Sequence, residues 1–446
     1  MLLAGRATGS RHGQSSQAAR LNDWVARHPP PGPFRHGFWR SPLRGPWLTS
    51  VLGVILLAGL PIVAATGLLS YAAYDPWLPG NDPTPHSGWL GFFPFAWPTQ
   101  PSWLYRLTQG VHVTLGLALL PVVLAKLWSV IPKLFQWPPA RSPAQAVERL
   151  SLVLVVGGAL FELATGIINI QNYYTFPFYF YAGHLYGAWV FIAGLAVHVA
   201  IKLPRMVAGL RSRSLRRELR TGRAGTGPES PDTGGSVASE PDAPTISRRG
   251  VLGLVGGASV TLAALTVGQT LDGFWRRTAL LAPRGRFYGT GPGDFPVNKT
   301  ASAVGIGRDQ VGPSYRLVLV GATRRTLSRD DLLSLPQHIH ELPIACVEGW
   351  STTQAWTGVR LSDLARLAGV ADPVAAHVES IQRGGPFRAA RLAHNQLRDP
   401  RSLLALRVNG IDLPLDHGYP ARTIIPAAPG VHCTKWVASI TFESAT

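Results

Sequence analysis

One short stretch of the chain combines a potential metal ligand with a tight turn. Residues 343–351 hold Cys346, one of only two cysteines in 446 residues, between an apolar, β-type entry (Leu342, Ile344) and a turn at Gly349. A thiolate is a soft metal ligand, and a glycine-containing turn lets the backbone approach a bulky ligand closely. On spacing alone, an isolated buried cysteine is more often a small hydrophobic side chain.

Three histidines in apolar runs form a second candidate group. An imidazole in a membrane-spanning helix is costly without a partner, so His112, His184 and His198 are functional candidates. His112 and His184 fall at similar depth on helices that run in the same direction. This placement predicts a bis-imidazole site for a b-type haem, with room provided by Gly110, Gly116 and Gly187. Interhelical hydrogen bonds between unrelated histidines are the structural alternative.

His198 follows His184 by fourteen positions and shares its helix face, roughly 21 Å further along the axis. It has no imidazole partner at its depth, where Lys126 stands instead. A second haem with another ligand therefore stays open, and Lys126 is expected to be an anchor at the cytoplasmic surface. Glu162 is either a hydrogen-bonded structural carboxyl or part of a proton path; quinone chemistry would need the latter.

The composition predicts that part of the chain lies in a membrane. Charged residues are 15% and hydrophobic residues 46%, and the net charge of +18 gathers beside apolar runs. The positive-inside rule explains that charge without a nucleic-acid partner. Residues 48–204 are expected to form a four-helix membrane domain, cytochrome b-like, with spans at 45–74, 107–125, 150–170 and 181–201.

Basic segments flank these spans and set the expected orientation. Residues 1–47 are a basic cytoplasmic arm, 205–249 a disordered cytoplasmic linker, and 250–272 a fifth, tethering helix. The pair Arg248–Arg249 before this helix resembles a twin-arginine export signal, or it is ordinary positive-inside flanking. Either interpretation places residues 273–446 outside, as a soluble α+β domain with strands near 315–320 and 436–442 and helices near 330–333 and 361–368.

The motif around Cys346 resembles a known family. C-V-E-G-W-S followed by W-x-G-V-x-L-x-D-L is similar to the molybdenum-ligating segment of the sulfite oxidase family of molybdopterin enzymes, and the resemblance covers about residues 290–446. It implies that Cys346 binds molybdenum directly. A disulfide between Cys346 and Cys433 would leave no thiolate for the metal, and the motif argues against it.

The resemblance also implies the other site residues. Phe295 and Asn298 stand where the family contacts the pterin early in the domain, and Arg388 falls in the region that lines the substrate side. The segment N-G-x2-L-P-L-x-H-G-Y-P-x-R carries His417 and Arg422, whose guanidinium suits the pterin phosphate. Thr434 and Lys435 belong to the closing element, and the preceding His432–Cys433 departs from the family pattern.

Together these features predict a membrane-bound oxidoreductase that contains molybdenum-molybdopterin and one or two b-type haems. The membrane part resembles four-helix haem-b cytochromes in general. The expected partners are the membrane, a quinone pool or redox partner, and a small oxide or oxyanion substrate. Reduction of an S- or N-oxide with quinol-derived electrons is the first interpretation. A sulfite-type oxidase that feeds electrons to the chain, or a non-catalytic haem sensor or binding module, are the alternatives.

Overall fold

The structure is a computed structural model, and it describes residues 24–35, 37–74, 95–139, 142–173, 175–230, 236–384 and 387–445. Outside the described residues lie residues 1–23 and 36 of the basic arm, residues 75–94, 140–141 and 174 of the predicted membrane domain, residues 231–235 of the linker, and residues 385–386 and 446 of the C-terminal domain.

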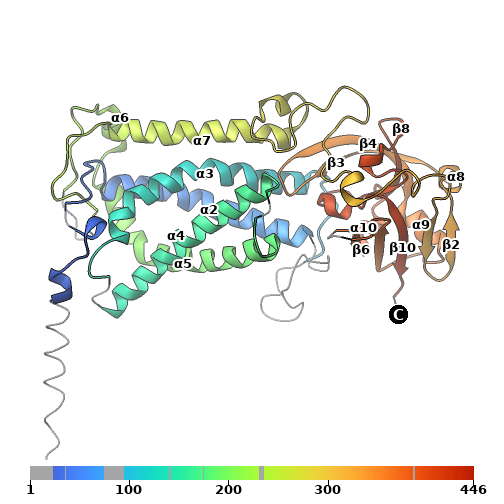
Figure 1. The fold of residues 1–446 in the computed structure, drawn as a ribbon, viewed down its shortest axis with the longest axis horizontal. Coiled ribbons are helices and arrows are strands. Elements are labelled where there is room, and N and C mark those ends of the chain that lie inside the picture. Colours follow the sequence, from blue (N-terminus) through green and yellow to red (C-terminus); the bar gives the residue numbers. More distant parts are fainter. Residues whose placement is uncertain are drawn as a thin grey trace, which may run out of the picture. The chain divides into compact units, whose positions relative to one another are not determined.

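Within the described residues, five helices are long and apolar enough to cross a membrane. They are α2 (Pro46–Tyr74), α3 (Leu104–Leu134), α4 (Pro143–Ile170), α5 (Phe180–Arg211) and α7 (Arg248–Leu271) (Figure 1). The five predicted spans are therefore present as helices. Most exceed the predicted limits, because a span needs only about 20 apolar residues while polar and aromatic flanks continue the helix. Prolines inside three of these helices, such as Pro61, Pro121 and Pro204, do not end them.

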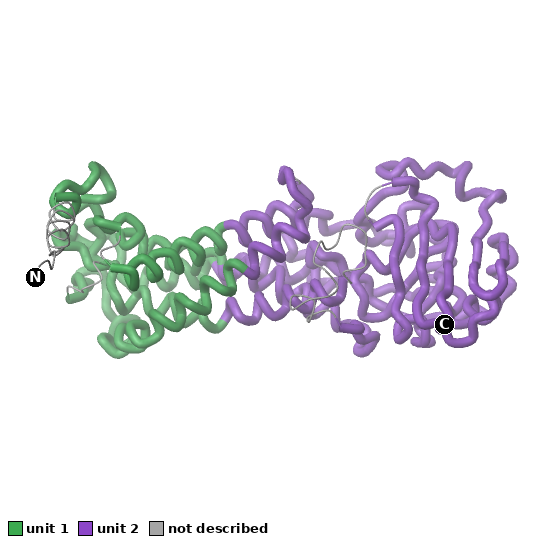
Figure 2. The backbone as a smooth tube through the Cα atoms, turned by 90° about the horizontal axis from the view of Figure 1, so that it is seen from below, with its two compact units in different colours: residues 1–58, 120–160, 190–258 green, residues 59–119, 161–189, 259–446 purple. Residues whose placement is uncertain are grey.

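The chain divides into two compact units, which Figure 2 shows in different colours. Unit 1 holds residues 1–58, 120–160 and 190–258, and unit 2 holds residues 59–119, 161–189 and 259–446. His198 and Lys126 belong to unit 1. His112, His184 and the whole C-terminal domain belong to unit 2, so the candidate haem ligands and Cys346 share one unit.

In unit 1, the described part of the linker is folded. It contains the short helix α6 (Leu215–Arg220), and Glu229 accepts a hydrogen bond of 2.9 Å from the Trp47 backbone N–H at the start of α2. A carboxylate at a helix N-terminus is stabilised by the helix dipole. The composition predicted disorder because amino-acid composition does not reveal contacts between residues far apart in sequence. Those contacts order residues 212–230.

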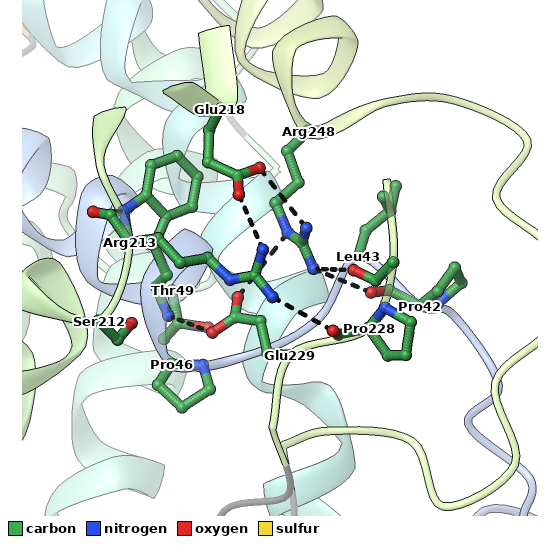
Figure 3. Close-up of polar contacts among 12 residues, drawn as sticks. Pro42, Leu43, Pro46, Thr49, Ser212, Arg213, Glu218, Pro228, Glu229 and Arg248 are labelled. Carbon is green, nitrogen blue, oxygen red and sulfur yellow. Dashed lines mark hydrogen bonds and ion pairs between the residues drawn. The ribbon is translucent and has the colours of Figure 1, made fainter. Parts of the chain in front are cut away.

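Arg248 is the centre of this folded segment. Its side chain is 1% exposed, and its Nη2 donates to the carbonyl oxygens of Pro42 (3.1 Å) and Gly227 (2.9 Å). The carboxylates of Glu218 and Glu229 lie 3.6 and 3.8 Å from its guanidinium (Figure 3). The first arginine of the pair therefore joins the arm, the linker and α7, while Arg249 is exposed.

The C-terminal domain in unit 2 is built on two sheets. One has the order β2-β1-β10-β5-β6, with β1 and β10 parallel; the other has the order β3-β4-β7-β8, with β9 paired to β7. The strands are β1 (Leu317–Val320), β2 (Arg324–Leu327), β3 (His338–Ala345), β4 (Ser351–Arg360), β5 (Ala375–Ser380), β6 (Ala389–Ala393), β7 (Leu403–Val408), β8 (Ile411–Asp412), β9 (Arg422–Ile424) and β10 (Val437–Glu443). The short helices of the domain are α8 (Arg329–Ser334), α9 (Leu361–Leu367) and α10 (His394–Arg398).

One core joins the two sheets. Leu319 and Ile440 of the first sheet and Leu404 of the second are fully buried in the same apolar cluster, together with Leu364 of α9. The α+β prediction is confirmed, as are the strands expected near 315–320 and 436–442 and both short helices. Gly358 is required where β4 pairs with β7, because a Cβ there would lie 2.0 Å from the Leu404 carbonyl oxygen.

The burial of Arg248 separates the two interpretations of the arginine pair. We expect Arg248→Lys to lower the free energy of unfolding by about 2 kcal/mol, because an ammonium cannot keep the forked contacts of a buried guanidinium. Arg249→Lys is the matched control and should leave stability unchanged. The measurement is thermal unfolding of the detergent-solubilised protein, alongside a reporter for export of the C-terminal domain. Equal loss of export in both variants, with unchanged stability, would favour an export signal instead.

Candidate redox sites

Cys346 stands in the turn that joins β3 to β4. The Cys346 N–H donates to the Trp350 carbonyl (2.9 Å), and the Gly349 N–H donates to the Cys346 carbonyl (3.0 Å). Gly349 has a φ of 89°, and a Cβ at this position would lie 3.0 Å from the Cβ of Val113. Glycine is therefore required both by backbone conformation and by space.

An ion pair between Arg284 and Glu348 fixes the conformation of this turn. The Glu348 carboxylate accepts two hydrogen bonds from Arg284 (2.9 and 2.6 Å) and one from the Trp350 indole (2.8 Å). Burial raises the pKa of the Cys346 thiol, and the Glu348 carboxylate raises it further, against smaller opposite effects of the Glu348 backbone N–H and of Arg284. A thiolate here therefore needs a cationic partner, which a metal ion provides.

Cys433 is buried in an apolar cluster with Ile344 and Trp356. Both cysteines are free, so the alternative of a disulfide between them is not present in the structure.

Five of the predicted cofactor residues gather in one cluster, which we call the anion pocket. Phe295 stacks on the His417 ring with centroids 3.6 Å apart, and Arg422 donates to the carbonyls of His417 (3.0 Å) and Cys433 (3.2 Å). The Lys435 ammonium donates to the carbonyls of Lys299 (2.7 Å) and Asp416 (2.8 Å). The fifth residue, Thr434, is buried and directly precedes Lys435 in the sequence.

This pocket carries buried positive charge without a paired carboxylate. In the described residues, neither Arg422 nor Lys435 forms an ion pair, and Arg422 Nε, Thr434 Oγ1 and His432 Nδ1 are buried without a hydrogen-bond partner. Burial lowers the pKa of Arg422 to about 10 and that of Lys435, which Arg422 and Lys299 lower further. Burial, Arg422 and Lys435 together lower the pKa of His417 to about 3. Such a cluster suits an anion that accepts hydrogen bonds, for example a phosphate.

Comparison with known proteins agrees with this geometry. The family described as oxidoreductase molybdopterin binding domain matches residues 307–446. Rat mitochondrial sulfite oxidase is 32% identical over 160 residues, which cover 29% of this chain and 29% of the relative. The uncharacterized oxidoreductase YuiH of Bacillus subtilis is 32% identical over 117 residues, which cover 26% of this chain and 58% of the relative.

The C-terminal domain is a molybdopterin domain of the sulfite oxidase family. The chain spans less than a third of the length of the rat sulfite oxidase that it matches. A solved structure, the sulfane dehydrogenase SoxCD from Paracoccus pantotrophus, is 23% identical and covers 30% of this chain and 39% of its own, with a TM-score of 0.28. That structural likeness carries no argument, and the assignment depends on the sequence matches.

The pocket suits the phosphate of molybdopterin. Its orphaned donors and its excess positive charge are what a buried phosphate would satisfy, and Cys346 is near enough for its thiolate to raise the pKa of Lys435. Asn298 is half-buried in the same loop as Phe295 and has no hydrogen bond in the described structure. Arg388 is exposed and directly follows Phe387, which packs against Tyr74 and Tyr181, so its predicted place on the substrate side stays a prediction.

The sequence did not reveal three contributors to this site. Lys299 lines the pocket, and the pair Arg284–Glu348 fixes the turn of the metal ligand. Glu348 stands inside the recognised motif, and its acidic side chain beside the cysteine was the available signal. Arg284 and Lys299 precede the family match at residues 307–446; Lys299 lies in the segment 295–300, where the resemblance implied early pterin contacts, whereas no pattern marked Arg284.

The two histidines that were paired by depth face each other in unit 2. The ring centroids of His112 and His184 are 6.3 Å apart and the planes meet at 84°. Two imidazoles bound to opposite sides of one metal ion, with metal–nitrogen distances of about 2 Å, have centroids roughly 6 Å apart. The Nδ1 of His112 lies 3.0 Å from the Val63 carbonyl oxygen, which leaves its Nε2 for a ligand.

His184 is oriented by a carboxylate. Its Nδ1 lies 3.1 Å from a Glu162 oxygen and 2.9 Å from the Thr165 hydroxyl. A histidine that binds a metal through one nitrogen usually has its other nitrogen held in this way, which fixes the ring and strengthens the ligand. Glu162 thus has a position suited to orienting His184, and the proton path predicted for it stays a prediction.

The expected glycine roles are partly wrong. At Gly116 no heavy atom lies within 4 Å of the position that a Cβ would take. Gly110, in contrast, faces Thr270 and Gly187 faces Glu162, so these two serve helix packing. Gly67 lies against the imidazole of His112 instead, where a Cβ would be 2.9 Å from Cε1. In unit 1, His198 has a buried Nδ1 without a hydrogen-bond partner, and Lys126 donates to the Thr49 carbonyl (2.5 Å).

Replacing each cysteine tests which one the metal needs. We expect Cys346→Ser to remove the thiolate-to-metal absorption and turnover, because a hydroxyl is a harder and poorer donor. Cys433→Ser should retain both and cost about 1–2 kcal/mol of stability, because it buries a hydroxyl among apolar side chains. Absorption spectra and molybdenum content of the two purified variants give the answer. Equal damage from both substitutions would contradict a role specific to Cys346.

Proposed function

We propose that the chain is a membrane-bound molybdenum oxidoreductase that exchanges electrons between a b-type haem and an extracytoplasmic molybdenum centre. The observation that carries the proposal is the opposed pair His112–His184 in the same compact unit as Cys346 and the anion pocket. The family match supports the molybdenum half, and five helices suited to a membrane support the other.

Arg422, Lys435 and Thr434 would hold the phosphate of molybdopterin, Phe295 and His417 would flank it, and Cys346 would ligate molybdenum. The bound cofactor supplies oxygen-atom transfer coupled to two electrons. The buried Arg422 and the half-buried Lys435 would neutralise the phosphate, and the pair Arg284–Glu348 fixes the ligand turn. His112 and His184 would hold haem iron, whose chemistry is one-electron transfer.

Reduction of an S- or N-oxide with quinol-derived electrons is the proposed direction. The reaction takes up two electrons and two protons and releases water with the reduced substrate, so a one-electron haem must act twice. Oxidation of a sulfite-like substrate is the second candidate, because relatives at about 30% identity are named sulfite oxidase. A non-catalytic sensor would not need the free, half-buried Cys346 in the same unit as an anion pocket.

The haem assignment is tested by removing one ligand at a time. We expect His112→Ala or His184→Ala to abolish the b-type spectrum and quinol-linked turnover. Activity with a soluble artificial donor should persist, because the molybdopterin domain has its own core. His198→Ala should leave the spectrum intact if there is one haem, or remove a second component if there are two. An unchanged spectrum in His112→Ala would refute the pairing, and wild-type protein without molybdenum would refute the molybdenum half.

Sidedness has its own test. The Lys/Arg-rich segments place the N-terminus in the cytoplasm and the molybdopterin domain outside. Reporter fusions after residues 100 and 290 should therefore show an outside location, and a fusion near residue 225 an inside location. An inside signal after residue 290 would overturn the proposed topology.

A further inference from the structure

Residues near the N-terminal end of α3 and at the C-terminal end of α7 form hydrogen bonds with the turn that carries Cys346. Three consecutive carbonyl oxygens after the cysteine each accept a hydrogen bond from a helix side chain. Gln109 Nε2 donates to Val347 O (2.6 Å), Gln269 Nε2 to Glu348 O (3.2 Å), and Thr270 Oγ1 to Gly349 O (2.6 Å).

The contact continues into the first residues of β4. The Ser351 hydroxyl donates to the Thr270 carbonyl (2.7 Å), Arg106 donates to the Thr353 hydroxyl (3.3 Å), and the Thr353 N–H donates to Asp272 (3.2 Å). The residues that contact the turn and β4 come from two places. Arg106 and Gln109 lie in α3, while Gln269, Thr270 and Asp272 lie at or just after the end of α7.

Packing closes around these bonds. Gly349 meets the side chain of Val113, and Ala345 and Val347 pack in a cluster with Tyr74 at the end of α2, Tyr105 in α3 and Tyr181 in α5. Gln269 is 2% exposed and Gln109 is 3% exposed, so their amides are buried and lose free energy if left unpaired. The carbonyls of Val347 and Glu348 accept from their Nε2 groups, while the Oε1 atom of each amide is buried without a hydrogen-bond partner in the described residues.

We propose that Gln109, Gln269 and Thr270 are positioning residues, which seat the metal-ligand turn on the membrane helices. The inference rests on the proposed role of Cys346 as a metal ligand. The seat fixes the backbone of the turn and hence the direction of the Cys346 side chain. A ligand displaced by the turn would change the electronic environment of the metal, since supporting contacts orient the groups that bind it.

The test uses full-length protein with isosteric substitutions. Gln109→Met and Thr270→Val remove one donor each at nearly constant volume. Matched controls are Gln171→Met, whose amide donates to the Leu281 carbonyl, and Thr266→Val, whose hydroxyl donates within α7 to Leu262. Thr270→Ser keeps the donor and is the rescue variant.

The first measurement is hydrogen exchange in metal-free protein at the Cys346 and Gly349 amides, both of which are hydrogen-bonded within the turn. We expect about fivefold faster exchange for each lost donor and about 25-fold for the double variant, from the ordinary net strength of a hydrogen bond. The controls and Thr270→Ser should match the wild type.

The second measurement is the thiolate-to-metal spectrum of molybdenum-loaded protein, which should shift in Gln109→Met and Thr270→Val while the b-type spectrum stays. Wild-type exchange rates and spectra in the double variant would overturn the seat. A wild-type protein that binds no molybdenum would instead overturn the proposed function, and the exchange result would still decide whether the seat exists.

Discussion

The C-terminal site depends on one electrostatic constraint, a buried guanidinium at Arg422 and a half-buried ammonium at Lys435, neither of which forms an ion pair in the described residues. A charge in a low-dielectric interior is stable only when paired or hydrogen-bonded. Arg422 and Lys435 satisfy part of this requirement with four backbone carbonyls, and they leave Arg422 Nε and Thr434 Oγ1 unused. The remaining demand is for an anion, and it explains why Phe295, His417 and Lys299 gather around the same point.

The cost of burying a charge also applies to Cys346, whose thiolate would be negative. A neutral thiol is stable in its buried turn, and the nearby Glu348 carboxylate disfavours a thiolate still more. The Arg284–Glu348 pair therefore does not activate the sulfur; it fixes the turn. A cation bound by the sulfur would favour the thiolate, which is consistent with a metal ligand.

Much of the architecture could be predicted because it depends on local signals. Apolar length gave the five helices, alternation gave β1 and β10, and depth along parallel helices paired His112 with His184. The misses depend on contacts distant in sequence. The linker looked disordered by composition, yet Arg248 contacts Pro42 across 206 positions. Gly110 was assigned to a haem cavity, but it faces Thr270, and only the packing of α3 against α7 reveals this.

The helix α3 brings the two candidate redox sites together. Gln109 and His112 are one turn apart, about 4.5 Å along the axis. Gln109 bonds the residue after Cys346, while His112 opposes His184. A shift of this turn of α3 would therefore disturb both sites at once. The same turn also carries Val113, which meets Gly349, so the helix is packed as well as hydrogen-bonded against the metal-ligand turn. Rigid attachment of this kind keeps the separation between the two sites constant, whereas a freely tethered domain would let it vary.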